Sequence, residues 1–158
     1  MGGDDIIYTG AGNDPQIKAG AGNDIIIFDG CGVKTVYGEE GNDIFKVHPC
    51  KEKIHFIPVL MDFEINNPNE KIDFSELSNI KSLKDLELGK TNVNIDPSLN
   101  KDKFGSSEHL DFKEAMPRKI PTTSICWEDT DEYSHCIYLP DITNEQVYQH
   151  PENFIFSL

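Results

Sequence analysis

The chain has 158 residues and 37% of them are hydrophobic, which suits one domain with a modest core. Acidic residues number 28 against 14 basic residues, so the formal net charge is −14. This charge argues against nucleic acid or an anionic membrane as a partner and favours a protein that binds metal cations. No apolar run reaches the roughly 18 residues of a transmembrane helix, so we expect no membrane span.

The N-terminal residues Met1 to Asp5 contain neither a basic nor an apolar signal region. The chain instead begins inside a repeat. We therefore expect it to be the C-terminal piece of a longer protein, with upstream domains before residue 1.

A short glycine-rich turn recurs through the first 43 residues. Four copies contain glycine, then Asp or Asn, then Asp, and a degenerate copy ends in lysine. In chain order the five turns are Gly3–Asp5, Gly12–Asp14, Gly22–Asp24, Gly30–Lys34 and Gly41–Asp43. Their last residues follow one another at intervals of 9, 10, 10 and 9, and an apolar segment such as Ile25–Phe28 follows each turn. This near-constant period predicts a repeat architecture.

Each residue type in this repeat has a role in binding a hard cation. Glycine lets the chain take positive φ and turn tightly, which exposes backbone carbonyl oxygens. The aspartate adds a carboxylate, and calcium takes about 6–8 such oxygen ligands. The next apolar residue points inward, so each repeat forms half a coil and the turns alternate between two edges of a flattened roll. A flexible linker is the alternative, but linkers lack regularly placed Ile, Val and Phe.

The repeat resembles that of the RTX family, whose nonapeptides bind calcium. The resemblance implies an all-β fold, in which residues 1–50 form a parallel β-roll and residues 51–158 form a β-rich capping segment with short helices. It also implies that Ca²⁺ is the cofactor. The implied ligand residues of the repeats are Gly3, Asp5, Gly12, Asp14, Gly20, Gly22, Asp24, Gly41 and Asp43.

The alternation divides the turns between two edges with different ligand sets. The first edge carries Asp5, Asp24 and Asp43, which are evenly spaced along the chain at one full coil each. Each ion in RTX proteins lies between adjacent turns of one edge, so the first edge is expected to offer two well-formed sites. The second edge places Asp14 opposite Lys34, where an ammonium group removes a ligand and adds repulsion. We predict that the second-edge site is weak or empty.

Two departures from the repeat are expected to weaken the middle of the roll. The strands after Asp14 and Asp24 carry one extra residue, which predicts a bulge in each. Pro15 removes one backbone donor. Five half-coils are also few, so we expect the roll to need the C-terminal half as a cap.

The second half begins with residues 54–57 and 59–63, which predict two strands that continue the sheet. The stretch 69–77 resembles the segment after the roll in serralysin-type proteases and in the repeat modules of alginate epimerases. There, acidic residues bind calcium beyond the last repeat, which implies Asp62 and Asp73 as further ligands here. The alternative is that Asp73 only caps a turn.

The remaining segments are less regular. Residues 78–86 have apolar side chains at intervals of three, which predicts one or two helical turns. The polar stretch 89–123 predicts an insertion loop, with a small helix near 108–116. Residues 151–158 resemble the Phe-rich end of the same family, which implies a signal for type I secretion. The alternative is an ordinary final strand that packs on the sheet.

The four cysteines, Cys31, Cys50, Cys126 and Cys136, match no zinc module and allow three pairings. Residues 124–127 and 136–139 predict two strands joined by the acidic turn 129–132. This hairpin places Cys126 opposite Cys136, so a disulfide between them is one alternative. Buried free thiols are the favoured alternative.

The sequence contains no recognisable pattern of catalytic residues. None of the five histidines lies in a His-Glu-x-x-His run, and there is no Gly-x-Ser-x-Gly elbow or phosphate-binding loop. We therefore predict that the chain is not an enzyme. The resemblance favours a module for type I secretion and calcium-dependent folding of a secreted, extracellular bacterial protein. The alternative is an adhesin or a polysaccharide- or receptor-binding module of an RTX toxin, effector or epimerase-like enzyme.

Overall fold

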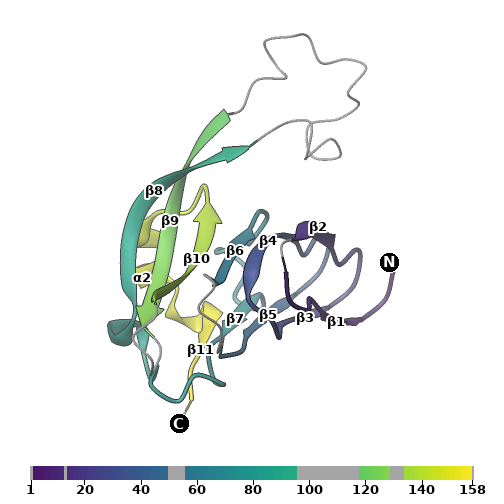
Figure 1. Cartoon of the computed structure of the whole chain (residues 1–158), viewed down its shortest axis with the longest axis horizontal. Coiled ribbons are helices and arrows are strands. Elements are labelled where there is room, and N and C mark those ends of the chain that lie inside the picture. Colours follow the sequence, from purple (N-terminus) through teal and green to yellow (C-terminus); the bar gives the residue numbers. More distant parts are fainter. Residues whose placement is uncertain (1, 13, 50–55, 96–117, 129–133, 158) are drawn as a thin grey trace.

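The computed structural model describes residues 2–12, 14–49, 56–95, 118–128 and 134–157, which are mostly β, as predicted (Figure 1). The strands are β1 (Ile6–Tyr8), β2 (Asp14–Lys18), β3 (Ile25–Phe28), β4 (Gly32–Tyr37), β5 (Ile44–Val47), β6 (Phe56–Leu60), β7 (Lys71–Asp73), β8 (Glu87–Ile95), β9 (Arg118–Glu128), β10 (Ser134–Pro140) and β11 (Phe154–Ile155). The helical elements are the 3-10 helices η1 (Leu83–Asp85) and η3 (Pro151–Asn153) and the α-helix α2 (Asn144–Gln149). None of these helices is long and apolar enough to cross a membrane.

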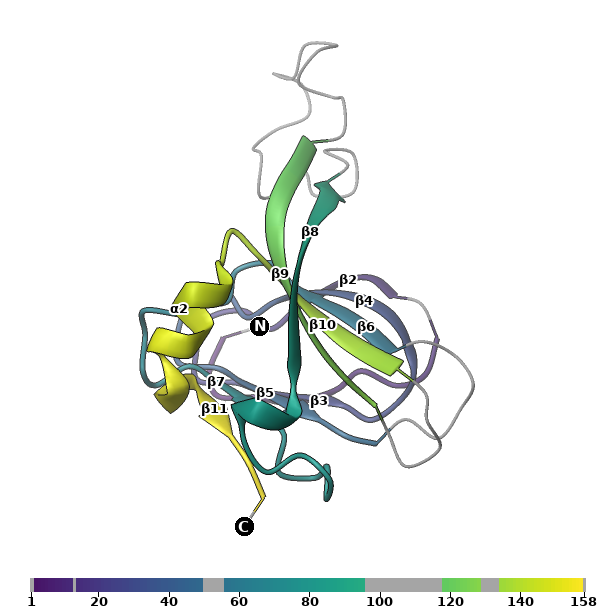
Figure 2. The same cartoon turned by 90° about the vertical axis from the view of Figure 1, so that its left-hand side faces the viewer.

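The strands form two sheets (Figure 2). The first sheet has the order β1-β3-β5-β7-β11, and all its neighbouring strands are parallel. The second has the order β2-β4-β6-β10-β9-β8, in which β10, β9 and β8 form an antiparallel meander. From β1 to β7, successive strands alternate between the sheets. Two strands and two turns therefore complete one coil, as the sequence predicts.

The pairing register confirms the predicted length of the coil. Ile6 pairs with Ile25 and Ile25 with Ile44, so each coil is as long as the spacing between the first-edge aspartates. In the second sheet the register shifts between the pair of Asp14 with Lys34 and the pair of Ile17 with Val36. This irregularity lies at the predicted bulge after Asp14.

The second predicted bulge is wrong. Strand β3 keeps a constant register with β1 and with β5. The extra residue after Asp24 therefore falls beyond Phe28, in the turn between β3 and β4. A turn absorbs an extra residue more easily than a hydrogen-bonded ladder does.

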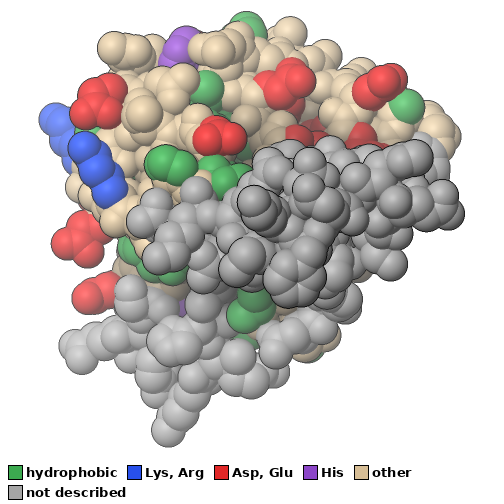
Figure 3. Space-filling view, turned by 90° about the horizontal axis from the view of Figure 1, so that it is seen from above, with side chains coloured by type: hydrophobic (Ala, Val, Ile, Leu, Met, Phe, Trp, Pro, Cys, Tyr) green, Lys and Arg blue, Asp and Glu red, His purple; other side chains and the backbone are tan. Residues whose placement is uncertain are grey.

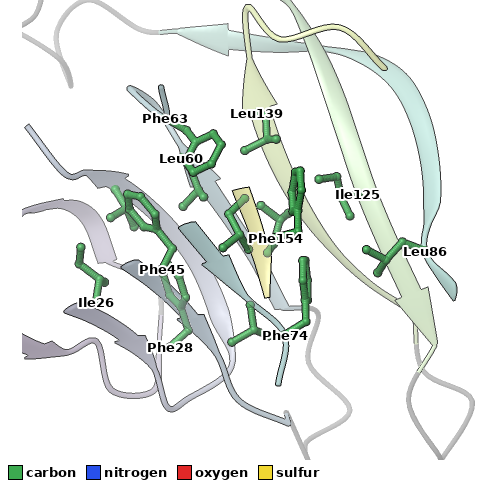
Figure 4. Packing of buried hydrophobic residues seen from close by; sticks show 14 of the residues in the cluster. Ile26, Phe28, Phe45, Leu60, Phe63, Phe74, Leu86, Ile125, Leu139 and Phe154 are labelled. Atoms are coloured by element: carbon green, nitrogen blue, oxygen red, sulfur yellow. The ribbon is translucent and has the colours of Figure 1, made fainter. Parts of the chain in front are cut away.

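A row of inward-facing side chains runs across all five strands of the first sheet. Ile7, Ile26, Phe45, Ile72 and Phe154 pair in turn from β1 to β11. The three central members are fully buried, whereas Ile7 on the outermost strand is half-buried. Figure 4 shows buried side chains of the first and second sheets in one interior. The core therefore continues from the repeats into the C-terminal half.

The C-terminal residues pack on this core through aromatic rings. The ring of Phe74 lies 6.5 Å from that of Phe154, 5.7 Å from that of Phe156 and 5.6 Å from that of Trp127, between centroids. Strand β11 also extends the first sheet beside β7. The predicted final strand is confirmed, and the division of the chain near residue 50 stays a prediction.

The two strands predicted at the start of the second half need correction, whereas the helical turn after them is confirmed. Within the described part of residues 54–63 there is one strand, β6, instead of two, and the chain turns at Met61 and Asp62. In this turn the Asp62 carboxylate accepts hydrogen bonds from the amides of Gly38 and Glu39. Of the one or two helical turns predicted over 78–86, one is present as η1, which Ser82 and Asp85 cap reciprocally.

The insertion loop predicted over 89–123 is wrong at both ends. Strands β8 and β9 pair antiparallel from Glu87 opposite Cys126 to Ile95 opposite Arg118. The polar composition of these residues favours a loop locally, but pairing with a distant strand overrides that preference. The small helix predicted near 108–116 lies outside the described residues.

The favoured alternative of free thiols is also wrong. The hairpin of β9 and β10 places Cys126 directly opposite Cys136, with their Cα atoms 4.1 Å apart, and the two form a disulfide. Cys31 is disulfide-bonded as well. The described part of the chain therefore contains no free cysteine.

Candidate metal centre

The three aspartates of the first edge are stacked one coil apart, at the start of β1, β3 and β5. The backbone amide of Asp5 donates a 2.8 Å hydrogen bond to Asp24 Oδ1. The amide of Asp24 donates a 3.0 Å hydrogen bond to Asp43 Oδ1. Each of the later aspartates thus uses one oxygen to hold the turn before it. The predicted alignment of Asp5, Asp24 and Asp43 is confirmed.

The second carboxylate oxygens of this row have no hydrogen-bond donor. Oδ2 of Asp5, Asp24 and Asp43 is buried and has no partner among the described residues. Asp24 and Asp43 are 0% exposed. Burying charged oxygens without a partner is costly, and a cation is the partner that an acceptor-only group needs. The row therefore fits a ligand set for a metal cation.

Backbone carbonyls supply neutral oxygens in the same gaps between turns. Gly22 and Gly41 both have φ +136°. A Cβ atom on Gly22 would collide with the carbonyl of Gly3, and one on Gly41 with the carbonyl of Gly22. Only glycine leaves room for a carbonyl oxygen that faces the next turn. Gly20, with φ +104°, belongs to the turn of Gly22.

An outer ladder of side chains explains the middle position of the repeat. The amide of Asn23 donates to Asp4 Oδ1 at 2.8 Å, and the amide of Asn42 donates to Asn23 Oδ1 at 2.9 Å. Asn67 Nδ2 continues the series with a 2.8 Å hydrogen bond to Asn42 Oδ1. Asn and Asp at this position therefore set the spacing of adjacent turns.

Glu70 continues the acidic row beyond the repeats, and the sequence prediction missed it. Lys71 pairs with Ile44, so Glu70 stands beside Asp43 as Asp43 stands beside Asp24. The amide of Lys71 donates to the carbonyl of Asp43 at 2.9 Å, as that of Ile44 donates to the carbonyl of Asp24 at 2.8 Å. Glu70 is 2% exposed. An acidic residue directly before a strand was the available signal, but Glu70 lies further beyond Asp43 than one coil of the repeat.

Several carboxylates crowd together at this end of the row, and the pKa values of Asp43 and Glu70 are raised. The pKa of Asp43 is raised to about 6, chiefly by burial and also by the charges of Asp24, Asp62 and Glu64. Burial raises the pKa of Glu70 to about 8, with added repulsion from Asp43, Glu64 and Asp62. Both pKa shifts mean that this cluster resists full ionisation without a counter-charge. A divalent cation would supply that charge.

The two ligands predicted outside the repeats have different surroundings. Asp62 accepts hydrogen bonds from the amides of Gly38 and Glu39, both at 2.9 Å, and belongs to the acidic cluster just described. Asp73 lies in β7, and its Oδ1 accepts a 2.8 Å hydrogen bond from the amide of Ser75. This contact is the one expected of a residue that caps a turn, which was the alternative to a calcium ligand in the sequence analysis.

The second edge has a different arrangement. Asp14 and Lys34 are paired in the register of β2 and β4, as predicted. The side chain of Lys34 is 0% exposed, and its Nζ donates a 2.6 Å hydrogen bond to the carbonyl of Gly12. Gly12 has φ +101°. An ammonium group therefore contacts the turn carbonyl that the sequence assigned to a metal.

In the described part of the chain, side chains alone do not complete a metal site. Among the residues that the structure describes, no group of three or more His, Cys, Asp or Glu side chains could hold a metal ion together. A calcium ion at the first edge would therefore need backbone carbonyls as well as carboxylates as ligands. This combination agrees with the ligand chemistry predicted for the glycine-rich turns.

Residues 1–30 match the family model of the RTX calcium-binding nonapeptide repeat, which comprises four copies. This part of the chain is therefore an RTX calcium-binding repeat region. The turn that ends in Asp43 lies beyond the matched residues, yet it keeps the same register as the turns before it. No curated protein and no solved structure matches the chain.

Proposed function

We propose, from the premise that the chain begins with RTX calcium-binding repeats, that it is a calcium-dependent folding module of a larger secreted bacterial protein. In this proposal the repeats form a parallel β-roll, the C-terminal half closes it, and the module has no catalytic role. The observation that carries the proposal is the row of buried oxygens, Oδ2 of Asp5, Asp24 and Asp43, which have no partner among the described residues.

The first edge would hold calcium between adjacent turns. Asp5 and Asp24 border one gap, together with the carbonyl of Gly3. Asp24 and Asp43 border the next gap, together with the carbonyl of Gly22. Bound calcium would supply positive charge to these oxygens. The residues themselves fix the spacing of the turns and exclude water from the carboxylates.

Because the module is highly charged, the stability of its fold would depend on the calcium concentration of the compartment. The net charge is −14, and acidic side chains are spread over the face shown in Figure 3. Without cations this charge opposes a compact chain. Extracellular calcium modules bind at about 10⁻⁴–10⁻³ M, so calcium outside the cell would stabilise the fold by mass action. The disulfide of Cys126 and Cys136 also favours an oxidising, extracellular location.

We also propose that the protein is exported by type I secretion. This proposal is supported by the resemblance of residues 151–158 to the ends of secreted RTX proteins. In this role the partners are the upstream domains and the type I secretion machinery. Fusing residues 100–158 to a reporter tests it directly: we expect export that depends on the secretion channel, and retention of the reporter inside the cell contradicts this role.

Isothermal titration of the purified chain tests calcium binding itself. We expect at least two calcium ions per chain, with magnesium binding much more weakly, because magnesium demands a small octahedral site and gives up its water reluctantly. Equal binding of both metals, or no binding of either, would contradict the proposal.

A further inference from the structure

Lys34 takes the place of the repeat aspartate in the fourth turn. It is paired with Asp14 on one side and with Pro58 on the other, so it occupies the acidic position of the second edge. Long side chains at such a position normally extend into solvent. Lys34 is instead among the largest fully buried side chains of the protein.

The oxygen that Lys34 contacts belongs to the class that would bind metal on the first edge. Gly12 stands two residues before Asp14, as Gly3 stands before Asp5 and Gly22 before Asp24. The φ angles of Gly12 and Gly3 are similar, +101° and +99°. The carbonyl of Gly3 faces the next turn of the first edge. On the second edge, the corresponding carbonyl of Gly12 accepts the 2.6 Å hydrogen bond from Lys34 Nζ.

We propose that the Lys34 ammonium group is a tethered cation that takes the place of a calcium ion on the second edge. The inference rests on the proposed function, because it assigns the site that calcium would otherwise fill. An ammonium group offers one positive charge and three donors, which match carbonyl and carboxylate oxygens. A buried charge is tolerated only where such partners surround it. The lysine thus occupies the cation position of the second edge, in addition to removing a carboxylate ligand from it.

A disulfide-bonded cysteine lies in the same turn as Lys34. Cys31, three residues before Lys34, is buried and disulfide-bonded. The amide of Gly12 donates a 3.0 Å hydrogen bond to the carbonyl of Cys31. The second edge is therefore held by groups that belong to the chain, while the first edge relies on a free cation. The number of ions is then set by the first edge alone.

The test compares the number of calcium ions bound by three full-length chains in isothermal titrations. Lys34→Asp restores the repeat aspartate. Lys90→Asp makes the same change of charge at an exposed position of β8, outside the roll. We expect Lys34→Asp to bind one more calcium ion than the wild type and Lys90→Asp to bind the same number as the wild type. Equal numbers for Lys34→Asp and the wild type overturn the proposal.

A milder variant covers the case in which Lys34→Asp does not fold in calcium. Lys34→Asn keeps a ligand oxygen without a charge, and we again expect one additional ion; no additional ion overturns the proposal. Failure of the wild-type chain to bind calcium contradicts the proposed function but leaves this test intact, because the test is the difference between variant and wild type.

Discussion

The backbone amide of Asp24 donates a hydrogen bond to Oδ1 of Asp43, 3.0 Å away and one coil further along the chain, while Oδ2 of Asp43 is buried without a partner among the described residues. One carboxylate therefore fixes the spacing of two turns and also presents a charged oxygen to the gap between them. The same relationship joins Asp5 to Asp24. In the proposed function, structure and cation binding therefore depend on the same side chains.

Removing the charge of Asp24, the middle aspartate of the row, should separate these two roles. Asp24→Asn keeps an oxygen that can accept the hydrogen bond from the Asp5 amide but lowers the charge of both first-edge gaps. We expect calcium binding at least about tenfold weaker in isothermal titration, because the number of charged ligands tunes affinity. Stability in EDTA should stay equal or rise, because like-charge repulsion falls.

Asp29→Asn is the matched control for this variant. Asp29 is exposed on the second edge, where its Oδ1 accepts a 2.8 Å hydrogen bond from the Gly10 amide. Its substitution should leave calcium affinity unchanged. Equal affinities for Asp24→Asn and Asp29→Asn would show that the first edge does not bind calcium.

The metal-free protein should lose stability as pH rises. Burial raises the pKa of Asp43 to about 6 and that of Glu70 to about 8, above their ordinary values near 4. The folded state therefore keeps protons that the unfolded state releases. The stability contributed by these groups is full below about pH 4 and is lost as pH rises through about 6 and then 8.

Urea unfolding in EDTA between about pH 5 and pH 9 measures this dependence. We expect the midpoint to fall across the range, and Glu70→Gln to fall less than the wild type above about pH 7, since glutamine does not titrate. A midpoint that rises with pH would contradict the assignment, as would a Glu70→Gln profile identical to the wild type.

A methyl group at Gly41 should disrupt the packing of two turns. Its φ of +136° is unfavourable for alanine, and the Cβ atom would collide with the carbonyl of Gly22. We expect Gly41→Ala to lose about 1–3 kcal/mol from backbone strain, measured by urea unfolding in calcium. Gly2→Ala is the control, since nothing lies within 4 Å of a Cβ there. Similar stability of the two variants would refute the close approach of the turns.

The cross-strand disulfide should stabilise the C-terminal half without affecting calcium. Cys126 and Cys136 close a short loop between β9 and β10. Replacing both with serine should cost about 2–3 kcal/mol in calcium-saturated protein, because the unfolded chain is less constrained. The number of bound calcium ions should not change. A lower calcium count would mean that the hairpin contributes to the metal sites.

Periodic features were predictable from the sequence alone. The constant spacing of Asp5, Asp24 and Asp43 was sufficient to place them on one edge, because a coil of fixed length repeats its contacts. The register of Asp14 with Lys34 followed from the same periodicity. The direction of the Lys34 side chain did not follow, since burial depends on the surrounding turns and not on the period.

Features that depend on long-range pairing were not predictable. Glu70 joins the acidic row after an irregular, longer segment of the chain. Its spacing from Asp43 differs from the repeat period and therefore did not predict its place in the row. The strands β8 and β9 are locally polar and become strands by pairing with each other. The disulfide of Cys126 and Cys136 was one of several open alternatives until the register of their hairpin was known.

Circular dichroism of the wild-type chain, first in EDTA and then in millimolar calcium, tests the central claim most directly. Magnesium at the same concentration is the control. We expect a weaker β-spectrum and a lower unfolding temperature in EDTA or magnesium, and a stronger β-spectrum with a clearly higher unfolding temperature in calcium. An identical folded spectrum and unfolding temperature in EDTA and in calcium would contradict the central claim.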